Sequence, residues 1–171
     1  LQDQSGNTSA AISDYDRAIE INPKDGDAYF NRGSIKLESG DNAEAIFDFH
    51  KTIEINPRHE NAYYNRGVIR VRSGDHAEAI IDFTKAIQID PKFINAYWGR
   101  ALSKERLENY LEAISDYTKV IEINPQYVDA YFNRAIANMK SGDLKSSCKD
   151  WIKAEDLGNK NAAKLLKEYC E

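Results

Sequence analysis

The 171-residue sequence lacks the features that mark most enzymes, metal proteins and nucleic-acid-binding proteins. It contains no glycine-rich phosphate loop, no nucleophile elbow and no HExxH motif. Its three histidines, His50, His59 and His76, are scattered and have no metal-ligand spacing. The net charge is −5, which disfavours a general attraction to nucleic acid. We therefore expect no catalysis, no metal, no cofactor and no nucleic-acid partner.

Long apolar runs are also missing. No stretch approaches the roughly 20 apolar residues that a membrane span needs. The first residues contain neither a basic leader nor an apolar segment. We expect a soluble protein without membrane insertion.

What the sequence does contain is a period of 34 residues, shared by its prolines and by sets of tyrosine, arginine and aspartate. These sets are Pro23, Pro57, Pro91 and Pro125; Tyr29, Tyr63, Tyr97 and Tyr131; Arg32, Arg66, Arg100 and Arg134; and Asp48, Asp82, Asp116 and Asp150. Such a period is typical of helical repeat arrays, in which each unit contacts only its neighbours.

Counted from residues 26, 60, 94 and 128, the units resemble the tetratricopeptide repeat. Small residues occupy unit positions 8 and 20, and large aromatic residues occupy position 24, as in that family. The residues are Gly33, Gly67, Ala101 and Ala135; Ala45, Ala79, Ala113 and Ser147; and Phe49, Phe83, Tyr117 and Trp151. Position 7 is arginine instead of the usual leucine, and position 11 is polar instead of tyrosine. The resemblance implies an all-α, right-handed superhelix of antiparallel helix pairs. The repeat sequences resemble those of bacterial members of the family.

The period also predicts the division of the chain. We expect a partial first unit at 1–25, mainly its second helix; full units at 26–59, 60–93, 94–127 and 128–161; and a capping helix at 162–171. The sequence starts inside a unit and lacks an initiator methionine, so we interpret it as part of a longer protein or as a chain whose earlier residues were lost. Between the helices of a unit, we expect glycine to end the first helix and the following aspartate to cap the second. These pairs are Gly40 with Asp41, Gly74 with Asp75 and Gly142 with Asp143.

Arginine at unit position 7 and aspartate at position 23 recur together in every full unit. An arginine between two helices of a unit would be half buried and would need a carboxylate. We expect structural ion pairs within each unit, or pairs with an aspartate of the preceding unit such as Asp14 with Arg32. The pairs within units would be Arg32 with Asp48, Arg66 with Asp82, Arg100 with Asp116, and Arg134 with Asp150.

In the family, the first helices of the units line a concave groove that holds an extended peptide. The resemblance places three sets here: the aromatic residues Phe30, Tyr64, Trp98 and Phe132; the amides Asn31, Asn65 and Asn133; and the apolar residues Val68, Leu102 and Ile136. An asparagine amide can both donate to and accept from a peptide unit, and aromatic residues are frequent binding hot spots. Packing within the array is the alternative explanation for these residues.

Two further features of the groove bear on its partner. The basic residues Arg72, Arg106 and Lys140 at unit position 13 favour an acidic partner or form a solvated rim. The carboxylate clamp that some family members use is disfavoured, because only its asparagine at position 6 is present.

Cys148 and Cys170 lie in the last unit and in the capping helix. Adjacent helices could bring them together as a disulfide, whereas two reduced thiols are expected in the cytosol. The compartment is therefore cytoplasmic or, if these cysteines are oxidised, periplasmic or exported.

These observations leave three hypotheses about function. The leading one is a non-catalytic scaffold whose groove binds a segment of another protein. The second is a structural module that self-associates through its partial first unit, where Ile12, Tyr15 and Ile19 form an apolar face. The third is the interaction arm of a larger enzyme.

Overall fold

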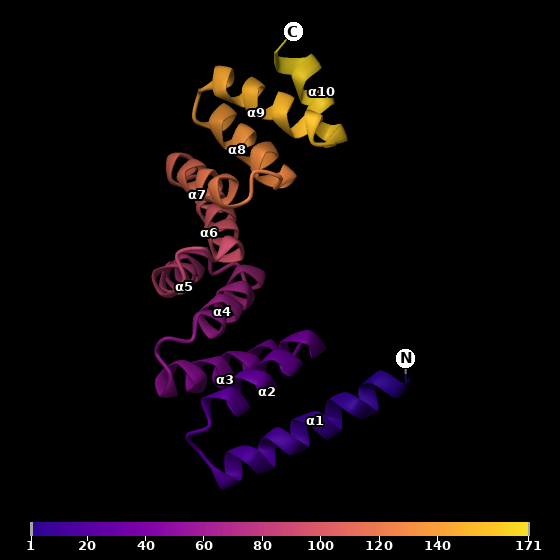
Figure 1. Cartoon of the computed structure of the whole chain (residues 1–171), viewed down its shortest axis with the longest axis vertical. Coiled ribbons are helices and arrows are strands. Elements are labelled where there is room, and N and C mark those ends of the chain that lie inside the picture. The colour runs from indigo at the N-terminus through magenta and orange to yellow at the C-terminus, as the bar shows by residue number, and fades with distance from the viewer. Residues whose placement is uncertain (1, 171) are drawn as a thin grey trace.

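The computed structural model describes residues 2–170, with side chains from residue 8 onward. Within this range it consists of α-helices stacked into an elongated body, with the first and last helices at opposite ends (Figure 1). The helices are α1 (Gln2–Ile21), α2 (Gly26–Ser39), α3 (Asn42–Ile55), α4 (Glu60–Arg72), α5 (His76–Ile89), α6 (Ile94–Arg106), α7 (Tyr110–Ile123), α8 (Val128–Lys140), α9 (Leu144–Asp156) and α10 (Lys160–Tyr169).

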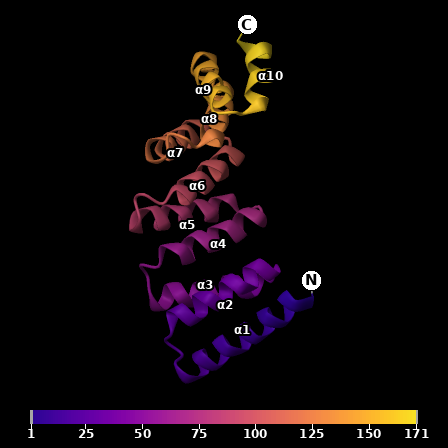
Figure 2. The ribbon, with the colours of Figure 1, turned by 45° about the vertical axis from the view of Figure 1, so that its right-hand side comes forward.

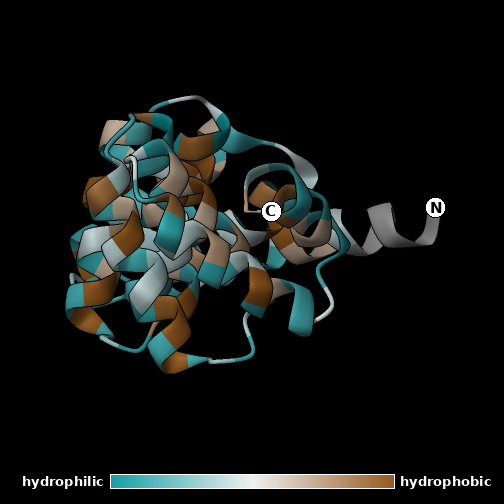
Figure 3. Ribbon diagram, turned by 90° about the horizontal axis from the view of Figure 1, so that it is seen from above, coloured by the Kyte–Doolittle hydropathy of each residue, from teal (hydrophilic) through white to brown (hydrophobic). Residues whose placement is uncertain are grey.

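The helices form antiparallel pairs that stack on one another (Figure 2). The pairs are α2 with α3, α4 with α5, α6 with α7 and α8 with α9. The second helix of each pair packs against the first helix of the next pair, and α4 also contacts α6. Seen along the long axis, the helices follow a curved path (Figure 3). The predicted all-α superhelix is confirmed.

Helix α1 corresponds to the second helix of a unit, extended at its start. One period before Asn42, where α3 begins, lies Thr8. One period before Ile55, where α3 ends, lies Ile21, the last residue of α1. Helix α1 therefore ends where the period predicts, but it begins at Gln2 and packs on α2.

The core of each unit is a large aromatic side chain held against small residues. Phe49, Phe83, Tyr117 and Trp151 are each at most 1% exposed. Gly33 and Gly67 lie so close to Phe49 and Phe83 that an added Cβ would come within 3.1 Å and 2.8 Å of the rings. Small residues thus let the two helices of a unit approach until the aromatic ring fills the gap between them.

The turns between paired helices follow the prediction only in part. Gly40 adopts a left-handed φ of 88° and ends α2, whereas Glu108 takes the same turn position in the third unit with φ 60°. The Asp143 side chain caps α9 by accepting from the Ser146 amide. The prediction of caps by Asp41 and Asp75 is wrong, because neither side chain makes a cap hydrogen bond.

The difference lies three residues after the cap position. Ser146 there offers a hydroxyl that donates to Asp143 Oδ2 at 2.6 Å. Glu44 and Glu78 at the equivalent positions carry carboxylates, which repel a second carboxylate and pair instead with Lys36 and Arg70.

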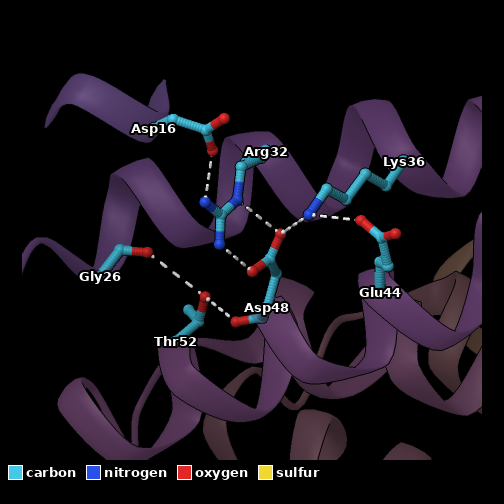
Figure 4. Close-up of polar contacts among 7 residues, drawn as sticks. All are labelled: Asp16, Gly26, Arg32, Lys36, Glu44, Asp48 and Thr52. Atoms are coloured by element: carbon cyan, nitrogen blue, oxygen red, sulfur yellow. Dashed lines mark hydrogen bonds and ion pairs between the residues drawn. The ribbon is translucent and has the colours of Figure 1, made fainter. Parts of the chain in front are cut away.

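A buried ion pair joins the two helices of every full unit (Figure 4). Arg32 donates from Nε and Nη2 to the two carboxylate oxygens of Asp48, at 2.9 and 2.5 Å. The Asp48 side chain is 0% exposed. The same two-bond geometry links Arg66 to Asp82, Arg100 to Asp116, and Arg134 to Asp150. The Asp48 carboxylate raises the pKa of the Arg32 guanidinium above its ordinary value, so the pair stays charged.

A second polar side chain, at unit position 11, also contacts each buried aspartate. This contact explains why position 11 is polar. Lys36 reaches Asp48 at 3.2 Å, and Figure 4 shows it bridging to Glu44 as well. Arg70 and Lys104 contact Asp82 and Asp116 in the same way, at 2.8 and 2.9 Å. In the last unit the amide of Asn138 replaces the cation and lies 3.4 Å from Asp150.

The arginines also link neighbouring units through their third nitrogen, Nη1. Arg32 Nη1 donates to Asp16 of α1 at 2.5 Å, so the expected pairing with Asp14 is wrong. Residues 14 and 16 are two apart and therefore lie on different faces of a helix. Arg100 and Arg134 donate to Thr84 and Thr118, one and two periods after His50, each at 3.0 Å.

His50 occupies this linking position in the second helix of the first full unit. Among residues 8–170, Arg66 Nη1 has no hydrogen-bond acceptor there.

The C-terminal helix α10 closes the stack by packing on α9. Cys148 and Cys170 form a disulfide that joins the two helices, with their Cα atoms 5.9 Å apart. Beneath α10 lies the fully buried Trp151, whose ring centroid is 6.1 Å from that of Tyr169. Lys164, Lys167 and Glu168 face the solvent.

We predict that Asp82→Ala lowers the free energy of unfolding by about 3–5 kcal/mol, because it leaves Arg66 and Arg70 without their buried carboxylate. The partial exposure of Arg70, 23% of its side chain, moves the loss toward the lower end of that range. The measurement is the urea midpoint followed by circular dichroism.

The matched control is Glu122→Ala, which removes an exposed i,i+3 partner of Lys119. It should leave the midpoint unchanged. If Asp82→Ala and Glu122→Ala unfolded at the same urea concentration, the buried pairs would not hold the two helices of a unit together.

Candidate functional site: the inner face of the first helices

The aromatic residues at unit position 5 form a ladder along α2, α4 and α6. Each ring is half buried between two other rings, one from the second helix of its unit and one from the residue before the next unit. Phe30 lies 5.8 Å from Phe49 and 4.3 Å from His59. Tyr64 lies 5.9 Å from Phe83 and 5.0 Å from Phe93, and Trp98 lies 5.4 Å from Tyr117 and 5.1 Å from Tyr127. These aromatic residues therefore carry part of the packing within each unit, as far as its last residue.

The third ring of each group was missed by sequence reasoning. His59, Phe93 and Tyr127 stand at unit position 34 and repeat with the same period as the other landmarks. Tracking aromatic character at this position would have found them. His59 differs from the other two because its Nδ1 also accepts from the Ala62 amide at 3.2 Å and caps α4.

A cavity of about 240 Å³ opens between α4 and α6. It brings together the four predicted groove residues Tyr64, Val68, Trp98 and Leu102. The other lining residues are Val71, Arg72, Phe83, Asn95 and Gly99. Seven of these nine residues present apolar side chains or, at Gly99, no side chain, so the wall is apolar except at Arg72 and Asn95.

Gly99 opens this cavity. A Cβ at Gly99 would lie 2.7 Å from Phe83 Cζ, closer than side-chain atoms approach. Gly67 of α4 also lies against the Phe83 ring, where an added Cβ would come 2.8 Å from Cε1, so the ring is closely packed against both α4 and α6. The close approach of Phe83 therefore requires glycine where the other full units have asparagine, and the missing side chain leaves space on the inner face.

A second cavity of about 480 Å³ lies between α6, α7 and α8. It includes the predicted groove residues Leu102 and Asn133. The remaining lining residues are Glu105, Arg106, Glu108, Tyr110 and Lys140. Both signs of charge are present, and Glu105 accepts a hydrogen bond from the Tyr117 hydroxyl at 2.8 Å. Phe30, Asn31, Asn65, Phe132 and Ile136 lie outside these two cavities.

The polar side chains of the inner face have few partners inside the molecule. Within residues 8–170, the amides of Asn31, Asn65 and Asn133 make no side-chain hydrogen bond. In the same part of the chain, Arg72 forms no ion pair. Burial raises the pKa of the Tyr64 hydroxyl, so this ring stays neutral at physiological pH. Among residues 8–170, the inner face thus presents amides and the guanidiniums of Arg72 and Arg106 without an ion-pair or hydrogen-bond partner.

Metal-binding clusters and membrane-spanning helices are absent from the described residues. No cluster of three or more His, Cys, Asp or Glu side chains could hold a metal ion. No helix between residues 2 and 170 has both the length and the apolar character needed to cross a membrane.

Sequence models of one family match most of the chain. A tetratricopeptide repeat model matches 60–93, a second matches 26–59, and a repeat model of the same family matches 4–40 and 106–142. A search of curated proteins finds no significant match.

Solved structures similar to this chain share its fold at low sequence identity. A crystal structure of MamA has 23% identity and a TM-score of 0.85, with 95% of each chain covered. MamA from residue 41 onward, from Desulfovibrio magneticus RS-1, has 18% identity and a TM-score of 0.81, covering 90% of this chain and 87% of its own.

YrrB, described as a repeat protein with an unusual peptide-binding site, has 20% identity and a TM-score of 0.84, covering 98% of this chain and 87% of its own. At these identities the likeness establishes the fold.

We predict that Gly99→Asn, which installs the residue of the other full units, lowers the free energy of unfolding by about 1–3 kcal/mol, because its Cβ overlaps the Phe83 ring. The reciprocal change Asn133→Gly places glycine in the interior of α8 and should cost only about 0.5–1 kcal/mol. Urea midpoints compare the two. Equal or greater stability of Gly99→Asn would contradict the close packing of Phe83.

Proposed function

The chain belongs to the tetratricopeptide repeat family, and from that premise we propose that it is a non-catalytic scaffold whose inner face binds an extended peptide or protein segment. The observation that carries this proposal is the apolar cavity between α4 and α6, together with amides that have no partner among the described residues.

The chemistry of this face suits an extended polypeptide. A peptide in extended form exposes backbone N–H and C=O groups along its whole length. The amides of Asn31, Asn65 and Asn133 follow the array at the same unit position and could bond these groups without reading side chains. The cavity supplies apolar contact area between them.

Packing alone accounts for the aromatic ladder but not for the amides. Phe30, Tyr64 and Trp98 each contact the rings at positions 24 and 34 of their own unit, so packing within the array explains their presence. The three asparagines make no such contacts, and Asn31 is exposed. The amides are therefore the sharper probe of binding, because changing them should leave the stack intact.

We predict that Asn31→Ala/Asn65→Ala/Asn133→Ala weakens peptide binding by about 10-fold to 100-fold, since up to three hydrogen bonds are lost. The probes are peptides selected from a random display library on the immobilised parent protein, and the measurement is fluorescence anisotropy. The melting temperature should stay close to that of the parent.

The matched control is Gln88→Ala/Gln126→Ala, which removes exposed amides outside the groove positions. Its affinity should equal that of the parent. If the triple variant also bound every selected peptide with parental affinity, the inner face would not be the binding surface.

A second candidate function is self-association through α1, and it is favoured by one observation. Ile21 is 86% exposed, whereas Ile55, Ile89 and Ile123 at the same unit position are partly covered. A second copy packed on α1 would cover this side chain.

We predict that self-association would appear as a mass that rises with concentration in light scattering and falls in Ile21→Ser. The control is Ile81→Ser, which removes an isoleucine that is 53% exposed on α5. A constant monomer mass over the whole dilution series would exclude this candidate.

A further inference from the structure

We infer that the bound segment anchors one large apolar side chain in the cavity between α4 and α6 and places a carboxylate against Arg72. The inference rests on the proposed function and adds to it the chemistry of the ligand: an acidic segment with an apolar anchor.

The size and lining of the cavity indicate a single side chain. Its volume of about 240 Å³ is below the roughly 300–1,000 Å³ of sites that hold drug-sized ligands. Tyr64, Val68, Trp98 and Leu102 wall it with apolar surface, and Phe83 closes its base next to Gly99. An aromatic, leucine or methionine side chain would remove this surface and its own from water.

Arg72 defines the charge of the group beside the anchor. It is the last residue of α4, and it is the only charged residue that lines this cavity. Among residues 8–170 it has no ion-pair partner, in contrast to Arg66 and Arg70 of the same helix. A guanidinium offers a fork of donors that matches a carboxylate, and it would repel a lysine or arginine at the same place.

The preference for an acidic group is confined to the part of the inner face around Arg72. The chain as a whole carries a net charge of −5, so it does not attract acidic segments in general. The neighbouring cavity adds Arg106 and Lys140 but also Glu105 and Glu108, whose charges oppose them. Asn95, in the first turn of α6, is the second polar group of the anchor cavity and can bond the peptide backbone beside the anchor.

The test is a selection of random 12-residue peptides, displayed on phage, against four immobilised proteins: the parent, Val68→Phe, Arg72→Glu and Arg58→Glu. Val68→Phe fills the cavity, and Arg72→Glu reverses the charge at its edge. Arg58→Glu makes the same charge change in the exposed turn before α4. Circular dichroism and melting temperatures establish that each variant is folded.

The parent and Arg58→Glu should enrich peptides in which Phe, Trp, Leu or Met lies within three residues of Asp or Glu. Arg72→Glu should enrich Lys or Arg in place of the acid, and Val68→Phe should lose the preference for a large anchor. For one selected peptide, replacing the anchor by Ala should weaken binding to the parent about 10-fold to 100-fold.

Three outcomes would overturn the inference, and they separate it from the proposed function. Peptides that need the three groove asparagines but show neither anchor nor acid would overturn the inference and leave the proposed function standing. Unchanged preferences in Arg72→Glu would do the same. Failure of the parent to enrich any peptide whose binding depends on groove residues would overturn both.

Discussion

The stack depends on one buried interaction, in which an aspartate of the second helix receives two hydrogen bonds from an arginine of the first. In the first full unit the Asp48 carboxylate is fully buried and also contacts Lys36, so three nitrogens of the first helix hold it. Such pairs add little net stability over an apolar core, but they fix the orientation of the two helices. That orientation turns unit positions 5, 6 and 9 of the first helices toward the inner face, where the cavities lie.

The sequence predicted the repeating parts of the fold well, because periodic residues report on periodic contacts. The ends of the helices follow from Pro57 and its equivalents, and the arginine and aspartate sets point to each other across each unit. The face that α1 turns toward α2 could not be predicted in this way. Asp16 rather than Asp14 meets Arg32, since the rotation of α1 about its axis follows from packing on α2. Asp41 and Asp75 make no cap hydrogen bond because a carboxylate, Glu44 or Glu78, stands where Asp143 meets the hydroxyl of Ser146.

The candidate site was only partly visible in the sequence. The aromatic, amide and apolar positions follow from the period, and four of the predicted residues do line one cavity. The cavity itself could not be predicted, because it arises where a residue departs from the period. Gly99 stands where the other full units have asparagine. The structure explains this difference, because a Cβ at this position would lie 2.7 Å from Phe83. The missing side chain at Gly99 thus accounts for the cavity between α4 and α6, which distinguishes this part of the inner face.

Besides the packing of helices, a hydrogen bond from an arginine to one side chain of the preceding unit joins neighbouring units. Thr118 serves Arg134, and Thr84 serves Arg100, whereas His50 gives Arg66 no such acceptor within the described residues. Tandem duplication of 94–127 would place Thr118 of the first copy beside Arg100 of the second. The array would then gain a unit whose junction keeps the threonine–arginine hydrogen bond. Duplication of 26–59 would set His50 opposite a second Arg32 and multiply the one junction that lacks this bond. The units share one fold, but they therefore differ in how well a duplicated copy would join its neighbour.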